Sequence, residues 1–365
     1  MLKTILKVTL IGSLLLSSGA HANTCPDTSA YDKAREVIAD LGKITTPNGV
    51  QDAFTLEING TVQAVNVRGK DKNNPILLFV HGGPASPLTP GMWQFQRPLE
   101  DYFTVVNWDQ RGAGKTYLLN DLDTLKQHMT IDDFVADTIA IAQQVTQRYG
   151  KDKVILMGHS WGTIVGMQAA LKRPQLFYAY VGVGQVINTR ENERLSFDYA
   201  QQQAKQHNNT EAIAELAELA PYPGDQPLTR DRIVGARKWA QYYGGLSAYR
   251  TDSSYFFRAA RLSPEYNAEQ VCAIDKGSMF SLELLLEAFL AVDYSGVKQF
   301  PIPVVMLMGR HDYTTPSAPT AAWLQQVKAP QKHGIWFEHS AHMLPWEEPG
   351  RFVVELVNVV RPMAQ

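Results

Sequence analysis

The feature that most constrains this chain is a G-x-S-x-G sequence at residues 158–162, with Ser160 at its centre. The apolar run at 153–157 ends at the first glycine, as a buried strand does, and residues 163–170 have the pattern of a helix. A serine on so sharp a strand-to-helix turn is held with its hydroxyl exposed, and the flanking glycines let the chain pack that tightly. The motif therefore predicts that Ser160 is a nucleophile.

Suitable partners for Ser160 follow it in the order acid, then histidine. A serine hydroxyl is a weak nucleophile, so it needs a base of intermediate pKa and a carboxylate to fix the tautomer of that base. An apolar run at 303–309 predicts a strand, and Asp312 lies in the loop after it. Residues 334–338 predict another strand, and His342 lies in the loop that follows. We therefore expect Ser160, Asp312 and His342 to be catalytic.

Other histidines compete for the role of base. His339 lies three positions before His342 and is the main rival; its alternative role is that of a capped histidine at a strand end. His311 precedes the base position in chain order. His159 lies inside the turn and is expected to point away from the site.

Acyl transfer also needs hydrogen-bond donors for the developing oxyanion. The predicted strand at 75–80 runs into His-Gly-Gly-Pro at 81–84, where two glycines allow backbone N–H groups to approach a ligand closely. We expect the amides of Gly83 and Trp161 to be the two donors, with His81 in a structural role.

Several of these motifs together resemble a known family. They are His-Gly-Gly-Pro at 81–84, Trp-Asp-Gln-Arg-Gly-Ala-Gly at 108–114, Gly-His-Ser-Trp-Gly at 158–162 and His-Met-Leu-Pro-Trp-Glu-Glu-Pro at 342–349. In combination they resemble the proline iminopeptidase (prolyl aminopeptidase) branch of the α/β-hydrolases, from about residue 50 to the end. In that branch a Glu-Pro element follows the catalytic histidine, which favours His342 over His339.

The resemblance implies a fold and an activity. The implied fold class is α/β, an α/β-hydrolase fold: a mostly parallel central sheet with helices on both faces and an inserted helical cap. The implied activity is serine hydrolysis of small substrates with a free amino end, often with proline first. The expected function is thus an aminopeptidase cleaving N-terminal residues from short peptides or amino-acid amides. The alternatives are an esterase or other small-acyl hydrolase, and a non-catalytic binding protein of the same fold.

The chain departs from the family pattern at two places, the loop after His-Gly-Gly-Pro and the segment of the cap that would bind the substrate's amino end. The family usually has a further glycine where this chain has Ala85, and a glutamate that binds the ammonium group in its cap. The nearest segment here, at 238–244, has tyrosine where that acid is expected, and a phenol is a poor partner for a buried ammonium. The lid helix that starts shortly after the strand ending near Val186 offers Glu191 and Glu193 as alternative ammonium partners.

Residues 109–116 imitate a phosphate-binding loop because they end in Gly-Lys-Thr. The leading glycine of that motif is missing, since Asp109 occupies its position, and we expect no helix to begin at Thr116. Nucleotide binding is therefore not predicted.

The start of the chain predicts export. Residues 1–22 combine a lysine-containing start, a short apolar run and an Ala-His-Ala cleavage site, the pattern of a secretory signal peptide. The run is too short to span a bilayer comfortably, so we expect no stable membrane insertion after cleavage. A periplasmic or secreted location permits a disulfide between Cys25 and Cys272, whose geometry sequence cannot decide.

Composition agrees with a compact enzyme. The 365 residues are 45% hydrophobic and 19% charged with a net charge of −2, which argues against nucleic-acid or membrane-surface binding. We find no metal-binding spacing, so no metal and no cofactor are expected, and the expected partner is a small peptide or acyl substrate.

The order of the predicted strands and helices indicates a core interrupted by a helical segment. Strands are expected at 54–58, 62–67, 76–80, 103–108, 153–157 and 178–183, alternating with helices, which indicates a mostly parallel sheet. Amphipathic helices are expected at 191–207, 210–219, 229–243 and 280–291. We therefore divide the chain into a signal peptide (1–22), the first part of the core (23–185), a helical cap (186–298) and the second part of the core (299–365).

Overall fold

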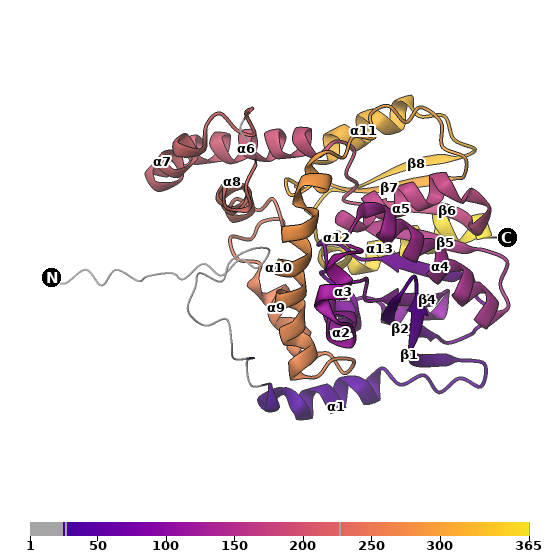
Figure 1. Ribbon diagram of the computed structural model, residues 1–365. Helices are drawn as coiled ribbons and strands as arrows, with labels where there is room; N and C mark the ends of the chain where they lie inside the picture. The colour runs from indigo at the N-terminus through magenta and orange to yellow at the C-terminus, as the bar shows by residue number, and fades with distance from the viewer. Residues whose placement is uncertain (1–24, 26–27, 226–227, 365) are drawn as a thin grey trace.

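Strands and helices alternate along this chain, and the strands form one central sheet (Figure 1). The computed structural model describes Cys25, residues 28–225 and residues 228–364. The predicted signal peptide at 1–22 lies outside these described residues.

The elements are as follows. The strands are β1 (Val50–Ile58), β2 (Thr61–Gly69), β3 (Ile76–Val80), β4 (Thr104–Trp108), β5 (Val154–His159), β6 (Phe177–Val183), β7 (Val304–Gly309) and β8 (Lys332–Phe337). The α-helices are α1 (Asp32–Leu41), α2 (Gly114–Leu119), α3 (Leu122–Lys126), α4 (Ile131–Tyr149), α5 (Trp161–Lys172), α6 (Thr189–Gln206), α7 (Thr210–Leu219), α8 (Arg230–Tyr242), α9 (Ser254–Ala259), α10 (Ala268–Leu290), α11 (Ser317–Gln326), α12 (Leu344–Glu347) and α13 (Pro349–Glu355). Short helical turns are η1 (Ser29–Tyr31), η2 (Thr89–Gln94), η3 (Arg97–Asp101), η4 (Pro174–Leu176), η5 (Ala260–Leu262), η6 (Leu356–Val360) and η7 (Arg361–Ala364).

The order of the strands brings the important loops to one edge of the sheet. In the described residues the sheet has eight strands in the order β1-β2-β4-β3-β5-β6-β7-β8. Only the β1–β2 and β2–β4 pairs are antiparallel, and the other neighbours run parallel. Because parallel strands end at the same edge, the segments that follow β3, β5, β7 and β8 meet there.

Apolar side chains cover both faces of the sheet. Successive residues of a strand point to opposite faces, so Ile76 and Leu78 join one buried cluster while Leu77 and Phe79 join the other. The first cluster contains residues of α4, α5 and α11, and the second contains residues of η2, η3 and α13. The central strands are therefore apolar throughout, as in sheets buried on both sides, and the predicted α/β fold class is confirmed.

Two local predictions are also confirmed. Asn59 and Gly60 form the turn of the β1–β2 hairpin with φ of 47° and 75°, the left-handed values that such a turn requires. Thr130 caps α4: its hydroxyl accepts from the Asp133 amide at 3.2 Å, and the Asp133 carboxylate accepts from the Thr130 amide at 3.0 Å. Asp thus replaces the usual Glu of a capping box.

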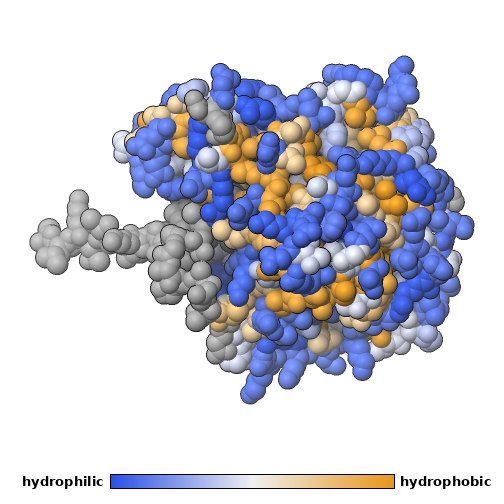
Figure 2. Space-filling view, in the orientation of Figure 1, coloured by the Kyte–Doolittle hydropathy of each residue, from blue (hydrophilic) through white to orange (hydrophobic). Residues whose placement is uncertain are grey.

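Between β6 and β7 the described residues form helices α6 to α10 and no strand. Figure 1 shows α6, α7 and α8 as a lobe that projects beyond the sheet, with α10 between this lobe and the core. Figure 2 shows apolar surface gathered where the lobe meets the rest of the molecule. Within the part of the chain that the structure describes, no helix has an apolar stretch long enough to cross a membrane.

The structure corrects the sequence prediction at three helices. Helix α10 starts at Ala268 rather than near 280, because Asn267 and Gln270 form a capping box ahead of a weakly amphipathic first half. Helix α9 lies in a segment where the sequence predicts no element. Helix α2 lies where no helix is expected, and in its first turn the Lys115 amide donates to the Asp109 carboxylate at 2.8 Å.

A disulfide joins Cys25 to Cys272, with the two Cα atoms 5.4 Å apart. It connects the beginning of the described chain to α10, across a sequence separation of 247 residues. A cross-link that closes so long a loop removes conformational entropy from the unfolded chain.

We predict that Cys272→Ser lowers the free energy of unfolding by roughly 2–4 kcal/mol because the unfolded chain regains that entropy. Thermal denaturation followed by circular dichroism should show a melting temperature several degrees below that of the wild type. Dithiothreitol should lower the wild-type value similarly and leave the variant unchanged. Equal melting temperatures for the oxidised wild type and the variant would contradict a stabilising role.

Candidate active site

Ser160 occupies the turn between β5 and α5 in an unusual backbone conformation. Its φ is 54° and its ψ is −122°, values that a residue with a side chain rarely adopts. Its amide donates to the Val183 carbonyl at 2.9 Å, and its own carbonyl accepts from the amide and hydroxyl of Thr163 at 2.8 and 2.6 Å. These bonds hold the turn in place and leave the side chain partly exposed.

The glycine two positions later is required by a close approach of chain segments. A Cβ atom at Gly162 would lie 2.0 Å from the Val80 carbonyl oxygen and 2.6 Å from that of His81. The first turn of α5 therefore packs directly against the end of β3. This contact places the loop after β3 beside Ser160: a Cβ atom at Gly82 would lie 3.1 Å from the Ser160 Cβ.

Asp312 and His342 come together in the loops after β7 and β8. Nδ1 of His342 lies 2.8 Å from Oδ2 of Asp312, and both residues are 2% exposed. An ionised carboxylate only accepts hydrogen bonds, so Nδ1 carries the proton and donates it. The other ring nitrogen, Nε2, is then the basic atom of His342.

Asp312 is held by the loop that carries it. Its Oδ1 accepts from the amides of Thr314 and Thr315 at 2.9 and 2.8 Å, the geometry of an Asx turn. The Thr315 hydroxyl lies 3.0 Å from each of three atoms: Asp312 Oδ2, His342 Nδ1 and the Gly184 carbonyl oxygen. Sequence reasoning missed Thr315; its position three residues after the acid was the available signal.

Two glutamates fix the loop that carries His342. Oε2 of Glu347 accepts from the Ala341 amide at 2.9 Å, and its Oε1 accepts from the Ala248 amide of the lid at 2.6 Å. Glu348 accepts from the Ser340 hydroxyl at 2.6 Å. Burial raises the pKa of Glu347, against the lowering effect of these hydrogen bonds. The Glu-Glu pair in the sequence therefore orients the histidine loop.

The rival histidines lie elsewhere. His339 is exposed, and its amide donates to Glu348 at 3.2 Å. His159 is expected from sequence to point away from the site; instead its Nε2 donates to the His342 carbonyl at 3.1 Å, and the two rings are 4.9 Å apart. Burial, reinforced by the neighbouring His342, lowers the pKa of His159 to about 3, so it is neutral at pH 7.

Strand β6 and the residue that follows it contact both Ser160 and His342. The Ser160 amide binds the Val183 carbonyl, and a Cβ atom at the next residue, Gly184, would lie 2.8 Å from Cε1 of His342. Among the described residues no hydrogen bond joins the Ser160 hydroxyl to the His342 ring. Such catalytic hydrogen bonds often tighten only when substrate binds.

The two expected oxyanion donors lie on segments that Gln110 ties together. The Gln110 side chain donates to the His81 carbonyl at 2.8 Å and accepts from the Trp161 indole at 3.3 Å. The Gln110 amide donates to Nε2 of His81 at 3.0 Å. Burial lowers the pKa of His81 to about 4, so it is neutral and structural, as expected. Gly83 has a φ of 122°, open only to glycine.

The two lid glutamates are already bound to arginines. Glu191 lies near the surface, and both its oxygens accept from Arg194, at 3.0 and 2.7 Å. Glu193 is fully buried and accepts from Arg237 and Tyr222. These contacts do not support the expectation that either residue meets a substrate ammonium. No group of three or more His, Cys, Asp or Glu side chains in the described residues is arranged to hold a metal ion.

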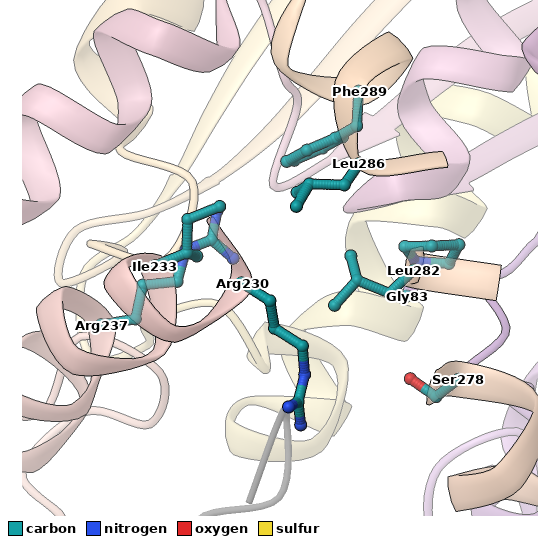
Figure 3. Close-up of a pocket in the computed structure, with 9 residues that line it drawn as sticks. Gly83, Arg230, Ile233, Arg237, Ser278, Leu282, Leu286 and Phe289 are labelled. Carbon is teal, nitrogen blue, oxygen red and sulfur yellow. The ribbon is translucent and has the colours of Figure 1, made fainter. Parts of the chain in front are cut away.

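A cavity opens between the lid and the predicted oxyanion loop (Figure 3). Its space is about 450 Å³, which includes volume open to solvent. It is lined by Gly83 and Pro84 from the loop after β3, Arg230, Ile233 and Arg237 from α8, and Ser278, Leu282, Leu286 and Phe289 from α10. The lining is thus apolar apart from Ser278 and the two arginines.

Known proteins are similar in sequence to this chain over most of its length. The chain is 32% identical to the probable aminopeptidase YbaC of Bacillus subtilis (strain 168) over 310 residues, which are 84% of this chain and 95% of the relative. It is 23% identical to a proline iminopeptidase of Saccharolobus solfataricus, over 81% of this chain and 87% of that protein.

Solved structures show the same fold. A proline iminopeptidase-related protein from Thermus thermophilus superposes with a TM-score of 0.59 at 17% identity, over 86% of this chain and 99% of that one. The proline iminopeptidase of Mycobacterium smegmatis gives a TM-score of 0.57 at 15% identity, with the same coverage. The model of the alpha/beta hydrolase family matches residues 77–356. Since this match spans more than half of the sequence, the chain belongs to the alpha/beta hydrolase family.

Proposed function

We propose that this alpha/beta hydrolase is a serine hydrolase in which Ser160, His342 and Asp312 form the catalytic triad. The observation that carries the proposal is the buried hydrogen bond of 2.8 Å between Asp312 and Nδ1 of His342, next to the strained turn at Ser160. This bond leaves Nε2 of His342 free to accept the Ser160 hydroxyl proton as the oxygen attacks a substrate carbonyl.

The proposed reaction proceeds through an acyl-enzyme. The amides of Gly83 and Trp161 stabilise the negative charge on the carbonyl oxygen, a contribution of roughly 3–4 kcal/mol per donor in comparable sites. His342 then returns its proton to the leaving group, and Asp312 stabilises the imidazolium formed in between. Water attacks the acyl-enzyme by the same route and releases the acid. Each proposed step is carried out by these protein groups and water.

We infer that the substrates are short peptides or amino-acid amides, cleaved at their N-terminal residue. The relationship to the probable aminopeptidase of Bacillus subtilis supports this reading, because the two chains align over most of both lengths. An esterase or other small-acyl hydrolase is the second candidate. It is favoured by the cavity, since no carboxylate suited to a substrate ammonium is among the described residues that line it.

We also propose that the protein is exported to the periplasm or secreted. The signal-peptide pattern at residues 1–22 supports this location. The disulfide between Cys25 and Cys272 accords with it, because disulfides persist mainly in oxidising compartments.

Ser160→Ala should abolish covalent labelling by a fluorophosphonate probe, because it removes the only protein oxygen that the proposed mechanism uses as nucleophile. The same change should lower kcat by roughly a thousandfold or more. Labelling is read from the intact mass of the protein, and circular dichroism checks that the variant is folded. Full labelling of the variant would move the nucleophile to another residue.

The base can be distinguished from its rival by a matched pair of variants. His342→Ala should reduce kcat by roughly a thousandfold or more, because it removes both the base and the partner of Asp312. His339→Ala should change kcat by less than about tenfold, because His339 is exposed and lies outside the Asp312 hydrogen bonds. Steady-state hydrolysis of one chromogenic substrate measures both, and the reverse ranking would assign the base to His339.

The proposed substrate class is tested by comparing free-amino substrates with their blocked counterparts. An aminopeptidase should cleave alanine 4-nitroanilide and proline 4-nitroanilide at least tenfold more efficiently than their N-acetylated forms. Here kcat/KM is measured for each, with Ser160→Ala as the blank. Equal values for free and blocked amides, together with faster cleavage of 4-nitrophenyl butyrate, would favour the esterase.

A further inference from the structure

Two arginine side chains line the cavity beside the proposed oxyanion loop. Of its lining side chains within the described residues, Arg230 and Arg237 are charged and none is acidic. Figure 3 shows Arg237 and Ile233 reaching in from α8 on one side, and Leu286 and Phe289 on the other. A ligand in this space therefore meets a guanidinium on one side and an apolar wall on the other.

Arg237 is held in a fixed orientation. Its Nε and Nη2 donate to one oxygen of the buried Glu193, and Tyr222 donates to the other oxygen. Burial lowers the pKa of Arg237, but Glu193, Tyr222 and Asp312 together outweigh burial and raise that pKa, so the guanidinium stays charged. Within the described residues, Nη1 donates no hydrogen bond to a protein atom. That end of the planar group is open to a ligand, and the Glu193 contact preserves its orientation.

The cavity is close to the reacting serine. Gly83 lines it, and the preceding Gly82 lies against Ser160. On the opposite wall, the ring of Phe289 lies 6.2 Å from that of Trp161, the residue that follows Ser160. The cavity therefore borders the proposed oxyanion loop, on the side of the molecule where a substrate of Ser160 would bind.

We propose that Arg237 binds a carboxylate of the substrate, so that the preferred substrates of this hydrolase carry a carboxylate near the scissile bond. Their apolar portion packs on Leu282, Leu286 and Phe289. The inference rests on the proposed serine hydrolase activity and specifies its substrate class. Glu193, a candidate ammonium partner from sequence, then acts as a positioning residue for Arg237.

A substrate carboxylate has two possible sources. It belongs either to an acidic side chain of the N-terminal residue, on the acyl side, or to the free C-terminus of a dipeptide, on the leaving side. Two matched substrate pairs separate them: glutamate 4-nitroanilide against glutamine 4-nitroanilide, and Ala-Ala against Ala-Ala amide. Each pair differs in one carboxylate and keeps nearly the same size.

The test measures kcat/KM for both pairs in the wild type and in two arginine variants of the full chain. The wild type should prefer the carboxylate member of at least one pair by roughly tenfold or more, as expected for a charge-assisted hydrogen bond. Arg237→Gln should reduce that ratio to within about twofold. The control Arg194→Gln, which changes an exposed lid arginine bound to Glu191, should keep the wild-type ratio.

Arg237→Gln leaves the buried Glu193 without its ion pair, and this variant could misfold for that reason. Two further measurements test the carboxylate site independently of this variant. The double variant Arg237→Gln, Glu193→Gln removes both charges and should also lose the preference. In the wild type, glutarate should inhibit competitively at least tenfold better than its diamide.

A wild type that shows no preference in either pair, or a preference that survives in both Arg237 variants, would overturn the carboxylate site alone. If the folded wild type hydrolysed none of these substrates, that result would instead overturn the proposed function.

Discussion

The contact between the first turn of α5 and the end of β3 is the constraint on which the site depends. Gly162 packs against the carbonyls of Val80 and His81, and Ser160 makes the turn from strand to helix with a positive φ of 54°. Such a conformation costs on the order of 1–3 kcal/mol and persists only where the surroundings over-determine it. The buried sheet on both sides of β5 provides those surroundings. The same contact packs the end of β3, which leads into the loop of Gly83, against the first turn of α5.

The rest of the site follows from the parallel sheet and from a few hydrogen bonds between lid and core. Asp312 and His342 come from the loops after adjacent strands, so the strand order alone brings them near Ser160. The carbonyl of Leu246, in the lid segment after α8, accepts from the His342 amide at 3.1 Å, and that of Gly245 accepts from the Thr314 amide at 3.1 Å. The lid is thus attached to both loops. Its position and the geometry of the proposed triad are therefore linked.

Much of this arrangement could be predicted from sequence, because strands, turns and caps are encoded locally. The apolar runs before Ser160 and Asp312 indicate strands whatever they pair with, and the Thr130 capping box needs only four residues. The partners of Glu193 could not be predicted in this way. Arg237 lies 44 positions away in sequence, and only the packing of α6 on α8 brings the two together. Gln110 and Thr315 escaped prediction for a similar reason: their roles depend on tertiary contacts rather than on a spacing.

A crystal structure of the protein after reaction with a fluorophosphonate tests the proposed roles of Ser160, His342 and the two amides most directly. Phosphorus should be bonded to Oγ of Ser160. One phosphonyl oxygen should lie about 3 Å from the amide nitrogens of Gly83 and Trp161, where the oxyanion of the reaction would form. Nε2 of His342 should lie within hydrogen-bond distance of the adduct. Phosphorus on another residue, or a phosphonyl oxygen directed to solvent away from both amides, would contradict the account.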